Sequence, residues 1–142
     1  MTLIEMLTAV TIVVILASGG VASYTFAVDA SNNAKAVADI ATIGARVIAY
    51  QLSNDRWPAT LAEIGWDDND PWDHPYRYLS FAGGVDRSAA RKDRNLVPVN
   101  SFFDLYSMGK DGASVPPFTA GVSQDDIVWA NDGSFVGLAE NY

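Results

Sequence analysis

The sequence predicts an α+β protein in which one long N-terminal helix (the stalk) carries a small C-terminal head. Three observations lead to this prediction. An apolar run fills residues 1–28, a helical pattern continues with no proline before Pro58, and short alternating stretches separated by turn residues follow. We therefore expect three parts: an apolar half-helix over 1–28, an amphipathic half-helix packed on the head over 29–54, and a globular head over 55–142.

The apolar half contains a single ionisable side chain, Glu5. About 25 helical residues rise roughly 37 Å, which is enough to cross a hydrocarbon core of about 30 Å. A carboxylate inside a bilayer is costly and usually has a partner, and the nearby cation is the α-amino group of Met1. Pairing within one straight helix is awkward, whereas the amino terminus of an adjacent copy would fix a stagger between subunits. The alternative is a simple membrane anchor whose acid lies near the water interface, favoured by the helix dipole.

The helical pattern changes at Asp29 from apolar on all sides to apolar on one face. Spacings of three and four place five residues on that face: Ala36, Ile40, Ile43, Val47 and Tyr50. We expect one helix over about residues 2–53. It ends at Asn54-Asp55 and Trp57-Pro58, because a residue before proline disfavours the helical region.

The head is expected to contain a short helix and a three-stranded antiparallel sheet. Thr60 to Glu63 has the spacing of a capping box for a helix ending near Ile64. Alternation predicts a strand at 76–81, and residues 102–108 and 127–129 read as a second strand and a short third one. The apolar tail 134–139 is expected to cover a sheet edge.

Composition excludes several kinds of function. The absence of cysteine excludes disulfides, thiolate metal sites and a cysteine nucleophile, and the single His74 excludes multi-histidine metal sites. A net charge of −8 argues against nucleic acid as the main ligand. Pairs of aspartates are the only candidates for acid–base catalysis, so we expect no enzyme.

Two loops have unusual charge. Four aspartates between residues 67 and 73 form either a solvated loop or a weak cation site. A second loop forms the one basic patch, which either contacts an acidic face of another subunit or is simply solvated. Its cations are Arg87, Arg91, Lys92 and Arg94.

Two sets of residues resemble a known family. Thr2-Leu3-Ile4-Glu5 with the apolar run resembles the mature N-terminus of type IV pilins and type II secretion pseudopilins. Three further segments resemble the C-terminal half of the major pseudopilin of type II secretion: 70–72 (DPW), 75–78 (PYRY), and 103–112, which contains FDLYS and Asp-Gly. The resemblance implies a pilin-like fold and a processed form that begins at Met1, with a methylated amino group and with Glu5 guiding subunit docking.

The resemblance also implies a function. The chain would be a structural subunit of a helical type IV pilus-like filament, a homopolymer held in the bacterial inner membrane before assembly. Prepilin peptidase and an assembly machinery would be its partners, and it would end in an extracellular or periplasmic filament. The alternatives are the major pseudopilin of a type II secretion pseudopilus and a membrane-anchored binding module that does not polymerise.

Two local features complete the predictions. Ser18, Gly19 and Gly20 either melt locally in the filament or allow close helix packing, because adjacent glycines weaken a helix and small residues let helices approach. The family holds a calcium ion in the loop after the second strand. The matching candidates here are Met108, Asp111, Asp125 and Asp126, with Asp132 as a further one.

Overall fold

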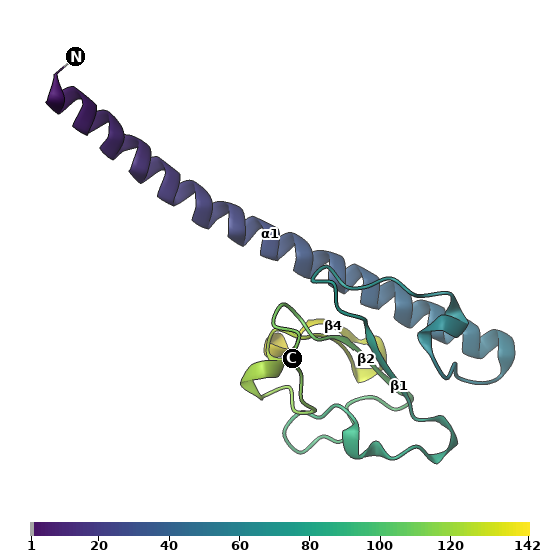
Figure 1. Ribbon diagram of the computed structural model, residues 1–142. Coiled ribbons are helices and arrows are strands. Elements are labelled where there is room, and N and C mark those ends of the chain that lie inside the picture. Colours follow the sequence, from purple (N-terminus) through teal and green to yellow (C-terminus); the bar gives the residue numbers. More distant parts are fainter. Residues whose placement is uncertain (1) are drawn as a thin grey trace. The chain divides into compact units, whose positions relative to one another are not determined.

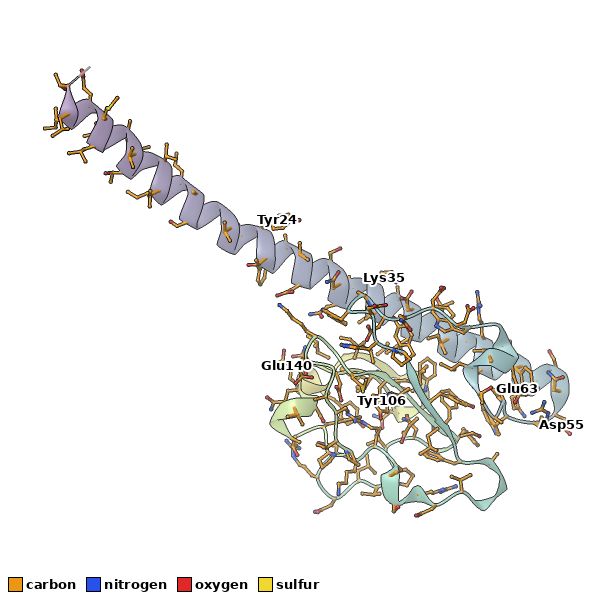
Figure 2. All side chains as sticks on the ribbon, viewed as in Figure 1. Tyr24, Lys35, Asp55, Glu63, Tyr106 and Glu140 are labelled. Atoms are coloured by element: carbon orange, nitrogen blue, oxygen red, sulfur yellow. The ribbon has the colours of Figure 1, made fainter. Side chains whose placement is uncertain are left out.

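The computed structural model describes residues 2–142, apart from the side chain of Ala22. One α-helix, α1, spans Leu3–Asn54, as the sequence predicts. The chain divides into two compact units, 1–32 and 33–142, so the second unit begins within α1. In the first unit the helical side chains stand out on all sides (Figure 2).

The core of the second unit lies between the last part of α1 and a sheet. Ala36, Ile40, Ile43 and Val47 are fully buried, and they form one cluster with Phe103, Leu105, Ile127 and Trp129 of the sheet. The predicted helical face is therefore confirmed. Tyr50 lies at its edge, half-buried, and donates a hydrogen bond to the Glu63 carboxylate (2.6 Å).

The sheet is an antiparallel meander of four strands in the order β1-β2-β3-β4 (Figure 1). Its strands are β1 (Arg77–Ser80), β2 (Phe103–Ser107), β3 (Ile127–Ala130) and β4 (Phe135–Leu138). The register pairs Arg77 with Tyr106 and Ser107 with Ile127. The beginning of β1, the end of β2 and the beginning of β3 therefore lie at the same end of the sheet.

The prediction of three strands was wrong, because the C-terminal tail adds β4. The tail covers the edge of β3, as expected, but it does so as a paired strand, with Ile127 opposite Leu138 and Ala130 opposite Phe135. The connection is a tight turn in which Asn131, Asp132 and Gly133 all have positive φ. Asparagine, aspartate and glycine tolerate that conformation best, so this run allows the chain to reverse and satisfy the edge of β3.

Both faces of the sheet are covered, which explains why β3 is buried at every position. Ile127 and Trp129 face α1. Val128 and Ala130 face a second cluster with Val99, Phe118 and Ala139 from the loops and the tail. A strand buried on both faces is expected to be a continuous apolar run rather than an alternating one.

The remaining regular elements are 3₁₀ helices: Leu61–Ile64, Ala82–Gly84, Arg87–Ala89, Gly121–Ser123, Asn131–Gly133 and Ala139–Asn141. The first replaces the predicted short helix, and the predicted capping box is wrong, because the Thr60 side chain makes no cap bond. The Glu63 carboxylate instead accepts bonds from Tyr50 Oη, Arg56 Nη2 (2.7 Å) and the amide of Ala59 (3.0 Å). These bonds fix the turn that leaves the end of α1.

Candidate functional site

The first turn of α1 is a capping box formed by Thr2 and Glu5. Glu5 Oε2 accepts hydrogen bonds from the Thr2 amide (2.7 Å) and from Thr2 Oγ1 (3.0 Å), and Thr2 Oγ1 accepts from the Glu5 amide (3.4 Å). Thr-x-x-Glu is the sequence signature of this motif, so the role of Thr2 was readable but was missed. Met1, the other predicted assembly residue, lies outside the described residues. Glu5 therefore has a partner within its own subunit.

The described side chains of residues 3–28, in the apolar half of α1, are all exposed. Large apolar side chains between residues 3 and 28 keep between 37% and 80% of their surface accessible. They are Leu3, Ile4, Met6, Leu7, Val10, Ile12, Val13, Val14, Ile15, Leu16, Val21, Tyr24, Phe26 and Val28. By length and composition this helix could cross a membrane.

Four hydroxyl groups of this half-helix bond to the backbone of the helix itself. Thr8, Thr11, Ser18 and Ser23 donate to the backbone oxygens of Glu5, Leu7, Ile15 and Gly19, at 2.7–3.1 Å. A hydroxyl bonded to its own helix needs no water, so these residues leave the surface compatible with lipid or with neighbouring helices. These side-chain hydrogen bonds were not predicted from the sequence.

The predicted melting segment, Ser18 to Gly20, is helical in the free chain. A Cβ built on Gly19 or Gly20 meets no atom within 4 Å. These glycines therefore leave a shallow strip on the helix, which fits close approach of another helix. The predicted melting in a filament stays a prediction.

The structure brings together two of the predicted calcium ligands and places the others elsewhere. Asp125 Oδ2 accepts from the Asp111 amide (3.1 Å), and the backbone of Gly109, next to Met108, packs against Asp125. The Asp126 carboxylate instead bonds to Arg91 and Ser114. Asp132 lies beyond the far end of β3, where it accepts from the Ser101 amide (2.8 Å).

No group of three or more His, Cys, Asp or Glu side chains that could hold a metal occurs among the described residues. Asp111 and Asp125 fit a calcium site, provided that backbone carbonyls supply most of the six to eight oxygen ligands. Asp126 fits poorly, because an arginine already neutralises its charge. Calcium binding at Met108, Asp111, Asp125 and Asp126 stays a prediction.

Arg91 does not belong to the basic surface patch that the sequence predicts, because it is buried. It is 2% exposed, and its Nη2 donates to Asp126 Oδ2 at 2.6 Å. Nη1 donates to Ser114 Oγ (2.5 Å) and to the Val115 carbonyl (2.8 Å). The guanidinium lies between the rings of Tyr106 (4.4 Å) and Phe118 (5.0 Å).

Arg91 thus joins three loops inside the second unit. Burial raises the pKa of Asp126 to about 6, against the opposing effect of Ser114 and Arg91. The Arg91 amide also donates to Asp104 Oδ2 (2.6 Å), and burial raises the pKa of that carboxyl group as well. Arg91 is therefore a structural residue, whereas Arg87 and Arg94 are exposed.

Of the four aspartates between residues 67 and 73, Asp70 is buried and the other three are exposed. Asp70 accepts from the amides of Trp72 (3.1 Å) and His74 (2.8 Å), and from Ser107 Oγ (2.5 Å) at the end of β2. Asp70 therefore has a structural role, while Asp67, Asp68 and Asp73 stay exposed.

Comparisons with protein-family models, with curated proteins and with solved structures found no match for this chain. The functional argument therefore depends on the residues themselves.

Proposed function

We propose that this chain is the structural subunit of a helical, type IV pilus-like filament, assembled through the apolar half of α1. In this proposal Glu5 pairs with the amino terminus of a neighbouring subunit. The observation that supports it most strongly is the exposed apolar surface over residues 3–28, which contains a single carboxylate. A helix that is apolar on all sides needs either lipid or other helices around it.

The carboxylate is what selects a protein neighbour over lipid. Lipid tails are as apolar as leucine, so apolar side chains alone give little preference for helix–helix contact. A buried carboxylate gains more from a charged amine than from neutral donors, because charge-assisted hydrogen bonds are about twice as strong. Glu5 therefore supplies a specific reason for one copy to bind another.

Thr2 stabilises the Glu5 carboxylate while the free subunit is in the membrane. Its amide and hydroxyl both bond to Glu5 Oε2, which lowers the cost of holding a carboxylate near the bilayer. Assembly then adds a neighbour's amine to a carboxylate that is already oriented. The free subunit stays anchored in the bacterial inner membrane until it pairs with that neighbour.

The test is a Glu5→Ala variant of the full-length chain, expressed in its native cells and compared with Glu140→Ala, an exposed acid in the head. We expect Glu5→Ala to insert normally into the membrane and to yield no filaments by electron microscopy, while Glu140→Ala assembles. Filaments of normal length from Glu5→Ala would refute the pairing. A wild-type chain that remains an anchored monomer while its export machinery is active would refute the filament.

The second candidate is the major pseudopilin of a type II secretion system. One observation favours it: two of the three segments that resemble that protein, 70–72 and 103–112, meet in space, since Asp70 accepts a hydrogen bond from Ser107. Long filaments in material sheared from the cell surface would favour the pilus. Short filaments confined to the periplasm would favour the pseudopilus.

A further inference from the structure

The charged side chains of residues 1–32 are Glu5 and Asp29, and they are widely separated. The step from Glu5 to Asp29 is 24 residues, which rise about 36 Å in a helix. A hydrocarbon core is about 30 Å thick, so the uncharged stretch is about 6 Å longer than a bilayer requires. Charge alone therefore leaves the depth of the helix in a membrane undetermined.

The aromatic side chains of this stretch lie near its C-terminal end. Tyr24 and Phe26, the aromatic pair, are the only aromatic residues before Tyr50. They are 71% and 77% exposed, and Figure 2 shows Tyr24 projecting from the helix. Four of the five residues over 29–33 are polar. Exposed aromatic rings followed by polar residues are typical of the level at which a helix leaves a bilayer, because such rings favour the headgroup region.

Tyr24 and Phe26 lie on opposite sides of α1. A step of two residues corresponds to about 200° around a helix of about 3.6 residues per turn. A partner protein docked on one side of the helix covers only one of these rings. The headgroup region of a bilayer surrounds the helix and receives both rings at the same level. The arrangement therefore favours a lipid boundary as the partner of the aromatic pair.

The distance from the aromatic pair to Glu5 matches the thickness of the hydrocarbon core. From residue 5 to residue 25, midway between the two rings, a helix rises about 30 Å. The hydrocarbon core is also about 30 Å thick. A typical helix tilt of about 20° shortens this projection by only about 2 Å. With the aromatic pair at one boundary of the core, Glu5 therefore lies at the other boundary.

We propose that the aromatic pair lies in the headgroup region on one side of the bilayer and thereby holds the Glu5 carboxylate at the opposite boundary. This inference rests on the membrane-anchored subunit of the proposed function, and it does not require a filament. At that boundary water reaches the carboxylate, while Thr2 bonds to one of its oxygens. Glu5 then loses its water only during assembly, when the amine of a neighbouring copy becomes its partner and offsets that loss.

Depth measurements on the spin-labelled full-length chain test this placement. The natural chain contains no cysteine, so each variant carries one nitroxide at one introduced cysteine. The chain is inserted into phosphatidylcholine vesicles, and depth is measured from collisions of the label with oxygen and with a water-soluble nickel chelate. We expect the deepest label at residue 15, midway between residues 5 and 25, and shallow labels at residues 3 and 27. The labelled positions are exposed ones along the helix: Leu3, Leu7, Ile12, Ile15, Val21 and Ala27.

Moving the aromatic pair tests whether it sets the depth. The fourfold variant Tyr24→Ala/Phe26→Ala/Val28→Tyr/Ala30→Phe moves the pair by four residues, about 6 Å along the helix. We expect the deepest position to shift by about two to four residues toward the C terminus, because exposing the apolar residues next to Glu5 opposes the full shift. The matched control, Tyr24→Trp/Phe26→Trp, keeps large aromatic rings at both positions and should leave the depth profile unchanged.

The outcomes separate this inference from the proposed function. An unshifted profile in the fourfold variant would overturn the role of the aromatic pair, and so would a natural chain whose label at residue 3 lies deep in the hydrocarbon. Filaments are scored separately, by electron microscopy of the natural chain in its cells. The expected depth profile without any filaments would refute the filament and leave this inference intact. A chain that does not insert into the vesicles would refute both.

Discussion

Removing one partner of the buried pair of Arg91 and Asp126 should destabilise the second unit strongly. Arg91→Met keeps the length and apolar contacts of the side chain and removes its charge. The change leaves the Asp126 carboxylate buried without its countercharge, with Ser114 Oγ as its remaining donor, and it removes one of the two donors to the Val115 carbonyl. Breaking a buried ion pair in this way costs about 3–5 kcal/mol.

That cost is a large part of the stability of a domain of about 110 residues, which is typically 5–15 kcal/mol. We expect the melting temperature to fall by roughly 15 °C. All four tryptophans lie in the second unit, at 57, 66, 72 and 129. Tryptophan fluorescence of the full-length chain in detergent micelles therefore reports its unfolding without interference from the apolar half of α1.

The matched control is Arg87→Met, which makes the same chemical change at an exposed position. It should shift stability by no more than about 0.5 kcal/mol. The double variant Arg91→Met/Asp126→Leu removes both charges and should recover most of the loss, because an apolar pair of similar volume often replaces a buried ion pair without cost. An Arg91→Met variant that is as stable as Arg87→Met would refute this reasoning.

Three further predictions concern the same unit. Gly44→Ala should destabilise it by about 1–3 kcal/mol in denaturant titrations, since the new Cβ would overlap the ring of Trp129, whereas Gly121→Ala meets no atom and should be neutral. The hydroxyl of Tyr50, the amide of Ala59 and Arg56 lower the pKa of Glu63 to about 2. The stability that this carboxylate provides is therefore complete above about pH 4.5 and is lost as the pH falls toward 2. In Glu63→Gln the free energy of unfolding should lack the part that the natural chain loses between pH 4.5 and pH 2. A pH profile identical to that of the natural chain would contradict this prediction. Calcium at Asp111 and Asp125 should raise the melting temperature of the full chain above its value in chelator, and Asp111→Asn should abolish the rise; equal midpoints would exclude the site.

Local patterns in the sequence were sufficient where each residue is governed by its neighbours in the chain. The extent of α1 and its buried face at Ile40 and Ile43 follow from helical periodicity. The first strand follows from alternation, the next two follow from short apolar stretches between turns, and the apolar character of residues 1–28 follows from composition. The Thr2–Glu5 capping box was equally local and was readable from its spacing.

The tertiary structure alone decided which charges are available on the surface. Arg91 and Arg87 look alike in the sequence, yet one is buried against Asp126 and the other is exposed, because loops from three parts of the chain enclose only the first. The fourth strand likewise depends on the unpaired edge of β3, which exists only once the sheet has formed. Burial and pairing between distant segments depend on the whole fold, so composition and spacing alone cannot supply them.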